Sequence, residues 1–217
     1  MKLAIFDLDN TLIAGDSDCL WGEYLSECGY VDSENYKSTH DRFYQDYLDG
    51  NLDIFAFLEF QLKPLAENDR HILESWRDEY IQKKIKPIIL ANALKLVEQH
   101  RQQGHELLII TATNRFLTEP IAHEFDIDNL IACEPEIVDG QYTGKVIGTP
   151  SYANGKVTRF NEWIAEKNNS IDESWFYSDS HNDIPLLRMV NHPIAVDPDD
   201  SLKQEAVKSG WKIISLR

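Results

Sequence analysis

The chain has little cysteine and no long apolar run, and both absences restrict where it can work. Its three cysteines, Cys19, Cys28 and Cys133, are odd in number and lack metal or redox spacing, which is typical of a reducing cytoplasm. No stretch approaches the roughly 20 apolar residues of a membrane span. Asp7 and Asp9 interrupt the apolar run near the amino terminus, which argues against a signal peptide. We therefore expect a cytoplasmic protein with no membrane partner.

Basic residues are also scarce. The 217 residues include 21 Lys and Arg against 37 Asp and Glu, which gives a formal net charge of −16. Phosphate backbones require clustered Lys and Arg, so this charge argues against a nucleic-acid partner. The same charge repels phosphorylated molecules at long range, so a phosphate site in this chain needs a local metal ion and a local lysine.

Enough apolar residues are present for one core with a subsidiary module, since 42% of the chain is hydrophobic. The apolar run 3–6 leads directly into Asp7 and Asp9 and predicts a buried strand of a parallel sheet. Ligands of open α/β sheets bind beyond the carboxyl ends of strands, where these two aspartates would emerge. A single aspartate at such a place is more typical of a turn after a core strand, so the pair has to be weighed together with the residues downstream.

The stretch from Asp16 to about Lys86 shows no β alternation and predicts helices. It holds twelve of the chain's 23 aromatic residues, all between Asp16 and Tyr80. Four sets of residues have the spacing of one helical face: Trp21, Tyr24 and Leu25; Phe43, Tyr47 and Leu48; Ile54, Phe55, Leu58 and Leu62; Ile72, Leu73, Trp76 and Tyr80. We interpret 14–86 as a small all-helical cap with its own core, inserted into a catalytic core of 1–13 and 87–217. The alternative is that these helices simply flank the main sheet.

After Pro87, helical and strand patterns alternate. Pro87 to Gln103 predicts a helix with Leu90, Leu94 and Val97 inward and Gly104 as its C-cap. Strands are predicted at 106–110, 130–133, 175–178, 194–196 and 213–215, and a hairpin at 136–146. This alternation predicts an α/β fold with a doubly wound parallel sheet.

Polar residues follow three of the predicted strands, and a lysine stands near the start of a helix. These residues are Asp7 and Asp9, Thr111 and Thr113, Asp179 and Asp183, and Lys156. Carboxylates as close as the first pair repel each other, and a hard divalent cation with oxygen ligands offsets this repulsion. The pattern therefore predicts a metal-containing site at the carboxyl edge of the sheet.

These residues carry a resemblance to a known family. Asp7-Leu8-Asp9-Asn10-Thr11 resembles the first motif, D-x-D-x-T, of the haloacid dehalogenase-like phosphatases. Thr111, Lys156 and the segment 179–183 are similar to the second, third and fourth motifs, in the family's order. A helical insertion directly after the first motif resembles the phosphoserine-phosphatase-like branch. The resemblance covers Met1 to about Val196 and implies a Rossmann-like core with a helical cap.

The resemblance also implies a mechanism. Asp7 is the expected nucleophile that forms an aspartyl-phosphate, and Asp9 the expected general acid and base. Mg²⁺ is expected between the Asp7 carboxylate, the Asp9 carbonyl and Asp179, with Asp183 bound directly or through water.

Three further residues are expected at the phosphate. By resemblance, the Thr111 hydroxyl and Lys156 hold phosphoryl oxygens, which gain from fixed donors in the transition state. Asn182 is expected to support the phosphate or a metal ligand. Without the motif context, Thr111 would read as a strand-end hydroxyl and Lys156 as an exposed helix lysine.

The acidic segment after the first motif bears on the substrate. Residues 14–50 contain nine acids and, as basic residues, only Lys37 and Arg42. Phosphoserine carries a carboxylate that calls for a cation, and Asp16 lies where the phosphoserine phosphatases have a glutamate. An acidic, aromatic-rich cap suits a cationic substrate better, with Asp16 and Asp18 as the expected contacts. The whole pattern looks like bacterial members of this branch that hydrolyse L-histidinol phosphate.

Several alternatives stay open from the sequence. One alternative within the phosphatase class is that the substrate is phosphoserine or a broad range of small phosphate esters. Another is that the acids of the cap form only a solvated face of an acidic protein. A phosphotransferase would use the same residues, whereas a non-catalytic binding protein is expected to lack one of the carboxylates. We expect a monomer or a homodimer.

Overall fold

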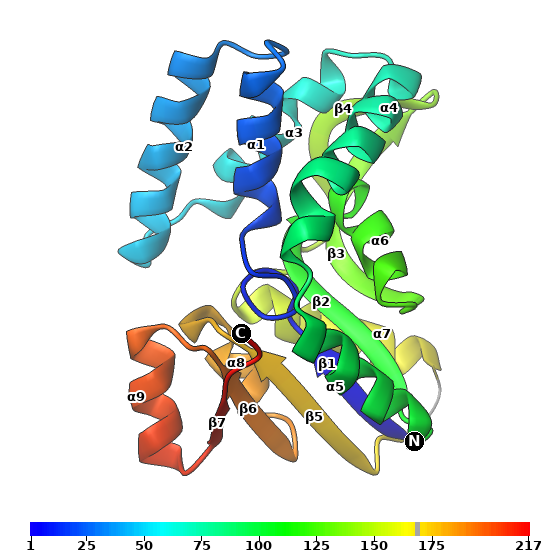
Figure 1. The fold of residues 1–217 in the computed structure, drawn as a ribbon, viewed down its shortest axis with the longest axis vertical. Coiled ribbons are helices and arrows are strands. Elements are labelled where there is room, and N and C mark those ends of the chain that lie inside the picture. The colour runs from blue at the N-terminus through cyan, green and yellow to red at the C-terminus, as the bar shows by residue number, and fades with distance from the viewer. Residues whose placement is uncertain (168–169) are drawn as a thin grey trace.

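The computed structural model describes residues 1–167 and 170–217, whose centre is a seven-stranded sheet (Figure 1). The strand order is β4-β3-β2-β1-β5-β6-β7. The strands are β1 (Lys2–Phe6), β2 (Glu106–Asn114), β3 (Asn129–Val138), β4 (Gln141–Ile147), β5 (Glu173–Ser178), β6 (His192–Val196) and β7 (Lys212–Ile214). All neighbouring pairs are parallel except β3 and β4, which are antiparallel. The predicted α/β class with a Rossmann-like core is confirmed, with a mixed sheet because the predicted hairpin adds β4 at one edge.

The first strand is central because its residues are buried on both faces of the sheet. Ala4 and Phe6 belong to one hydrophobic cluster, and Leu3 and Ile5 belong to the other. A strand covered on both faces reads as a continuous apolar run, which is the pattern that the sequence shows. The residues that follow β1 therefore emerge at the middle of the sheet's carboxyl edge.

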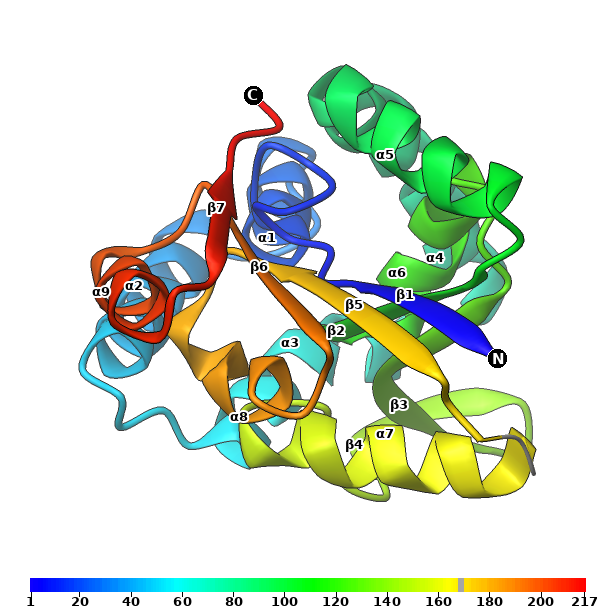
Figure 2. The ribbon, with the colours of Figure 1, turned by 90° about the horizontal axis from the view of Figure 1, so that it is seen from below.

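Helices cover both faces of the sheet (Figure 2). On one face, α5 (Ala91–Gln102) and α6 (Arg115–Glu124) contribute Val97, Phe116 and Leu117 to the first cluster. On the other face lie α7 (Asn154–Lys167), α8 (Ile184–Leu187) and α9 (Asp200–Ser209). This two-sided cover is the doubly wound arrangement.

Four further helices stand beyond the carboxyl edge of the sheet (Figure 1). They are α1 (Ser17–Glu27), α2 (Ser33–Leu48), α3 (Ile54–Ala66) and α4 (Arg70–Tyr80), followed by a π turn, η1 (Ile81–Ile85), and a 3-10 turn, η2 (Lys86–Ile88). The side chains of Asp16, Asp32 and Asp53 accept hydrogen bonds from backbone N–H groups of the first turns of α1, α2 and α3. Part of the acidic character of this region therefore caps helices.

The four helices are joined to the sheet by more than their chain connections. Trp21, Tyr24, Leu62 and Tyr80 belong to the same hydrophobic cluster as Phe116 of α6. Helix α3 packs along β4. The chain enters and leaves the helices through paired segments, since Ala14 N donates to the Ile88 carbonyl (2.8 Å) and Leu90 N to the Leu12 carbonyl (3.2 Å). The boundaries at 14 and 86 stay a prediction.

Several local predictions were wrong in register. The helix predicted from Pro87 begins at Ala91 and buries Ala93, Val97 and His100, so Leu94 lies on its exposed side. The buried stripe of α3 begins at Leu58, and Phe55, one turn earlier, is 58% exposed.

Two further predictions missed the extent of a packed face or strand. Ile72 of α4 is exposed, because the buried residues of that helix are Leu73 and Tyr80. The strand predicted at 130–133 continues to Val138, where it becomes the first arm of the hairpin.

None of the helices in the described ranges has the length and apolar character needed to cross a bilayer.

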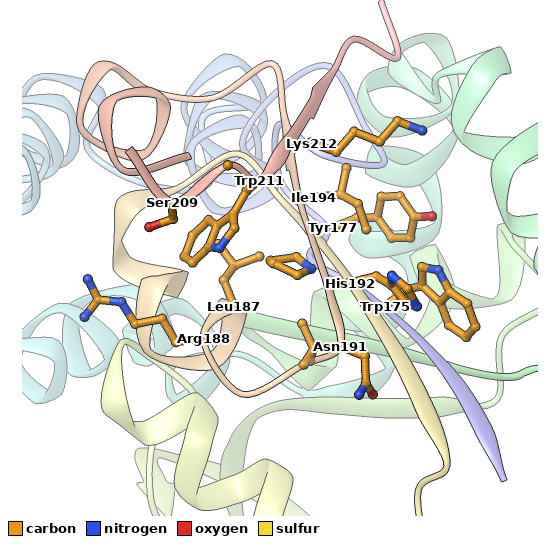
Figure 3. A pocket seen from close by; sticks show the side chains of 13 residues that line it. Trp175, Tyr177, Leu187, Arg188, Asn191, His192, Ile194, Ser209, Trp211 and Lys212 are labelled. Atoms are coloured by element: carbon orange, nitrogen blue, oxygen red, sulfur yellow. The ribbon is translucent and has the colours of Figure 1, made fainter. Parts of the chain in front are cut away.

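A hollow of about 760 Å³ surrounds the first residues of β6, away from the carboxyl edge (Figure 3). Trp175, Tyr177 and Ile194 on its lining belong to the cluster on one face of the sheet, whereas Leu187 and Trp211 belong to the other. Strand β6 therefore runs between side chains of the two hydrophobic clusters within this hollow.

A histidine pair is buried beside this region. His100 is 6% exposed, its Nε2 lies 2.8 Å from the Tyr177 hydroxyl, and its Nδ1 lies 2.7 Å from Nδ1 of His105. The His105 ring stacks on Trp175. The His192 ring stacks on the same indole (Figure 3). Burial, with the neighbouring His105 as a second cause, lowers the pKa of His100 to about 4.

This burial predicts a loss of stability in mild acid. The unfolded chain binds a proton at His100 below about pH 6.5, whereas the folded protein resists protonation down to about pH 4, so stability falls across that window as the pH decreases. Between pH 7 and pH 5, His100 should cost about 2 kcal/mol of unfolding free energy. Urea unfolding at both pH values should show a smaller loss in His100→Gln than in the wild type. An equal loss in the two proteins would contradict the assignment.

Candidate active site

A cavity of about 830 Å³ lies between the carboxyl edge of the sheet and helices α1 to α3. Nine aspartates line it: Asp7, Asp9, Asp16, Asp18, Asp41, Asp179, Asp183, Asp199 and Asp200. Among the described residues, Lys156 is the only Lys or Arg on the lining. The predicted site residues Thr111 and Asn182 also line the cavity. The structure therefore brings every sequence-predicted site residue to one cavity.

Lys156 lies between two buried carboxylates. Its Nζ donates to Asp7 Oδ1 at 2.7 Å and to Asp183 Oδ2 at 2.8 Å, and its side chain is 5% exposed. Burial alone would lower the pKa of Lys156, but the charges of Asp183 and Asp7 outweigh it and raise the pKa. Burial raises the pKa of Asp7, and Lys156 counteracts this rise. The lysine is therefore a fixed positive charge next to the first aspartate.

A tight turn places this lysine. A Cβ on Gly155 would lie 2.0 Å from the Pro150 carbonyl oxygen, so only glycine fits there. Ser151, fully buried, donates its hydroxyl to the carbonyl of Thr111 in β2. Lys156 N then donates to the Ala153 carbonyl at 3.1 Å as α7 begins. The turn is thus fastened to the sheet directly before the lysine.

Asp9 is held through both carboxylate oxygens. Its Oδ1 accepts from Ser17 N at 2.7 Å, and its Oδ2 accepts from the Thr113 hydroxyl at 2.9 Å and the Thr111 hydroxyl at 3.5 Å. Burial, followed by the nearby charge of Asp16, raises the pKa of Asp9 to about 6. A carboxyl group with a pKa near neutrality can both donate and accept a proton under physiological conditions.

Asp179 is tied to the first motif by Thr11. The Thr11 hydroxyl donates to Asp179 Oδ1 (3.2 Å) and accepts from Asp179 N (3.1 Å). Burial, followed by the charges of Asp7 and Asp183, raises the pKa of Asp179. These carboxylates, distant in sequence, are therefore close enough to repel one another in space.

The two aspartates at the start of α1 differ from each other. Asp16 is exposed and serves as the N-cap, with its Oδ1 accepting from Cys19 N at 2.8 Å. Asp18 is 4% exposed, and its Oδ1 accepts only from the Asn114 side-chain amide, at 3.3 Å, among the described residues. Burial, followed by the charges of Asp16 and Asp9, raises the pKa of Asp18. A cationic group in the cavity would relieve this unfavourable burial.

Comparison with known proteins identifies the family. A family model described as "haloacid dehalogenase-like hydrolase" matches residues 4–188. The chain belongs to the haloacid dehalogenase-like hydrolases. The prediction made from the four motifs is confirmed.

Relatives within this family include named phosphatases. A histidinol-phosphatase of Neisseria meningitidis serogroup C (strain 8013) is 45% identical over 220 residues, covering 100% of this chain and 99% of that protein. A phosphoserine phosphatase of Mycobacterium tuberculosis is 28% identical over 224 residues, covering 99% of this chain and 70% of that one. The prediction of a phosphatase is confirmed at the level of enzyme class.

Solved structures agree with the fold. A crystal structure of a protein of unknown function from Bordetella pertussis Tohama I superposes with a TM-score of 0.95 at 40% identity, covering 100% of this chain and 99% of that one. A substrate-bound phosphoserine phosphatase superposes with a TM-score of 0.71 at 18% identity, covering 98% and 92%. The second likeness concerns the fold alone.

Hydrolases of this family generally use Mg²⁺, and the donor set of the cavity fits such an ion. Within residues 1–167 and 170–217, no three side chains of His, Cys, Asp or Glu form a ready metal cage. Mg²⁺ usually takes only one or two carboxylates and fills its other positions with water and phosphate oxygens. Asp7 and Asp179 offer such a pair. They are close enough that the negative charge of Asp7 raises the pKa of Asp179.

Sequence reasoning gave no role to several residues that hold the site together, although it named Thr113 beside Thr111 after the second strand. Thr113 and the Ser17 backbone fix Asp9, and Ser178 donates its hydroxyl to Asp183 Oδ2 at 2.7 Å. Thr11 was part of the first motif, but no role followed from its position. A polar residue next to each motif aspartate was the available signal. Tyr47 and Tyr152, which also line the cavity, gave no signal beyond aromatic content.

The turn before Lys156 yields a matched test. Gly155→Ala forces the 150–155 turn apart and displaces the lysine, which should reduce kcat/KM for p-nitrophenyl phosphate by on the order of 10²-fold. Ala153→Gly on the same turn is the control. Ala153 has a φ of 48°, so glycine relieves strain there, and activity should stay at the wild-type level. Full activity in Gly155→Ala would show that the turn does not position Lys156.

Proposed function

We propose that this protein is a Mg²⁺-dependent phosphatase that hydrolyses L-histidinol phosphate through an aspartyl-phosphate on Asp7. The observation that carries the substrate is the 45% identity to a histidinol-phosphatase over the full length of both chains. The chemistry rests on the geometry of Asp7, Lys156 and Asp9 in one cavity.

Asp7 is the proposed nucleophile because one of its carboxylate oxygens is hydrogen-bonded to Lys156 and the other has no hydrogen-bond donor among the described residues. Lys156 binds Oδ1 and orients the carboxylate, while Oδ2 accepts no hydrogen bond from the described residues. In the first step, a bond forms between Asp7 Oδ2 and phosphorus, and the bond from phosphorus to the ester oxygen breaks. Carboxylates are established nucleophiles for phosphoryl transfer.

Asp9 is the proposed general acid and base. With a pKa near 6, its carboxyl group gives a proton to the departing alcohol oxygen in the first step. In the second step, water attacks phosphorus, its proton passes to Asp9, and the bond between phosphorus and Asp7 breaks. Inorganic phosphate leaves, and both carboxyl groups return to their starting states.

The phosphate must be bound within an acidic cavity. Lys156 supplies a fixed positive charge, and the Thr111 hydroxyl and Asn182 supply donors on its lining. Asp7, the Asp9 carbonyl and Asp179 are the proposed Mg²⁺ ligands, with Asp183 bound directly or through water. When bound, this ion neutralises phosphate charge and orients the phosphoryl group.

The acidity of the cavity favours a substrate with cationic groups over phosphoserine. Lys156 is already paired with two carboxylates, which leaves no Lys or Arg on the described lining for a substrate carboxylate. Histidinol phosphate has an ammonium and an imidazole and no carboxylate. Asp18 is the proposed partner of a cationic group because it is buried without a cation, and exposed Asp16 adds negative charge beside it.

The cellular setting belongs to the same proposal. Cys19, Cys28 and Cys133 are all free thiols, which is consistent with a reducing cytoplasm. A small phosphate ester is the proposed partner, and a monomer or homodimer remains the prediction.

Removal of the metal or of the nucleophile tests the mechanism. Hydrolysis of p-nitrophenyl phosphate should disappear with EDTA and return with added Mg²⁺, because the phosphate then lacks its main neutralising charge. Asp7→Asn should retain its circular dichroism spectrum and show no turnover above background. Turnover at the wild-type rate by Asp7→Asn would remove Asp7 as the nucleophile.

Steady-state kinetics tests the substrate. kcat/KM for histidinol phosphate should exceed that for phosphoserine by on the order of tenfold or more, since the carboxylate of phosphoserine lacks a cationic partner. Asp18→Asn should lower kcat/KM for histidinol phosphate while p-nitrophenyl phosphate hydrolysis persists. Glu23→Gln, an exposed acid on the same helix, is the matched control and should leave both rates unchanged. A preference for phosphoserine would overturn the substrate assignment.

A further inference from the structure

The segment 179–183 is held by side chains from outside the sheet. It carries Asp179 at one end and Asp183 at the other, with Ser180 and Asn182 between them. The Ser180 Oγ accepts from Asn182 N at 3.2 Å, and Ser180 N donates to Ser178 Oγ at 3.1 Å. The shape of this segment, which sets the spacing of its two carboxylates, therefore depends on Ser180.

Two tyrosines bind the side chains of this segment. The Tyr47 hydroxyl and Ser180 Oγ lie 2.7 Å apart, in a hydrogen bond between residues 133 positions apart in the chain. The Tyr152 hydroxyl donates to Asn182 Oδ1 at 3.3 Å. The Tyr47 ring centroid is 6.3 Å from that of Tyr152 and 6.2 Å from that of His181. Ser180 and Asn182, two of the three residues between the carboxylates, are thus each hydrogen-bonded to a tyrosine from another element.

Tyr47 belongs to α2, a helix that forms one wall of the cavity. Tyr44, Phe43 and Asp41 of the same helix line the cavity, whereas Ser180 lies on the sheet side. The hydrogen bond from Tyr47 therefore crosses from the cap to the segment that carries the proposed metal ligands. It exists only while α2 lies against the core.

We propose that Tyr47 is a positioning residue that makes the arrangement of Asp179 and Asp183 depend on closure of α2 over the cavity. This inference rests on the proposed function, because it concerns the same carboxylates. When α2 lies closed, the hydroxyl of Tyr47 fixes Ser180 Oγ, which holds Asn182 N and thereby the turn into Asp183. When α2 moves away to admit substrate, the segment loses this restraint. The catalytic arrangement is then complete only around an enclosed substrate.

The first test removes the hydroxyl alone. Tyr47→Phe should lower kcat by roughly fivefold, the value of one hydrogen bond, for both histidinol phosphate and p-nitrophenyl phosphate. It should also raise the Mg²⁺ concentration needed for half-maximal activity, while KM changes little. Tyr30→Phe, a cap tyrosine that does not line the cavity, is the matched control. A rise in KM confined to histidinol phosphate would mean that Tyr47 contacts the substrate instead, and would overturn the proposal.

A double-mutant cycle tests the route of the effect. Ser180→Ala should lower kcat in the same way, and Tyr47→Phe combined with Ser180→Ala should be no slower than Ser180→Ala alone. Multiplied losses in the double variant would show that the two residues act independently, which would contradict the coupling.

Hydrogen exchange separates this inference from the proposed function. Amides 180–183 should exchange faster in Tyr47→Phe than in the wild type or Tyr30→Phe, whichever phosphate ester the enzyme uses. Faster exchange with no activity on either ester would sink the proposed function and leave the structural coupling in place. Unchanged exchange, or faster exchange with wild-type kcat in an active enzyme, would overturn the inference.

Discussion

A buried lysine between two buried carboxylates is the interaction on which the site depends. Lys156 approaches Asp7 and Asp183 within 2.8 Å on the side of the cavity nearest the sheet. Removing Lys156 would leave two uncompensated buried carboxylates, which is strongly destabilising, whereas neutralising Asp7 alone leaves the lysine paired with Asp183. The three residues come from the segment after β1, from α7 and from the segment after β5, so their contact also fastens three separate parts of the chain at the carboxyl edge. Stability and reactivity at this point therefore have the same source.

The rest of the cavity is organised by its excess of negative charge. Most of its aspartates have a defined partner that lowers the cost of burial: Thr113 and Ser17 for Asp9, Thr11 for Asp179, and His181 for Asp199. Among the described residues, Asp18 has the Asn114 side-chain amide and the nearby Thr113 hydroxyl as partners and no cation. This difference makes Asp18 the acid whose burial a cationic ligand would relieve under the proposed function. Under the proposed function, the phosphate end of the ester would meet Lys156 and its cationic end would meet Asp18, so the two ends would bind different groups.

The motif residues could be predicted because parallel strands bring their carboxyl ends to one edge. Asp7, Thr111 and Asp179 each follow an apolar run, and topology alone then places them together in the cavity. The antiparallel edge strand was visible only as a hairpin, and the register of α5 was misjudged by one residue because Leu94 and Ala93 fit similar stripes. The bond between Tyr47 and Ser180 could not be predicted, since it depends on how α2 docks rather than on any local pattern. The contact between His100 and Tyr177 likewise joins two distant segments, and hydrophobic periodicity does not predict how such segments pack together.

The hairpin of β3 and β4 has a consequence for how molecules reach the site. The paired segments at 12–14 and 88–90 form a narrow neck, which by itself would let the helices swing as one body. Helix α3, however, packs along β4. Ala66 of α3 lies so close to Gly144 of β4 that a Cβ added to Gly144 would be 3.2 Å from the Cβ of Ala66. A rigid-body rotation of the helices would have to break the packing of α3 against the hairpin, so this flank restrains the motion. Any opening of these helices would therefore have to widen the opposite flank, between α2 and α9, whose residues Tyr44 and Ser201 both line the cavity.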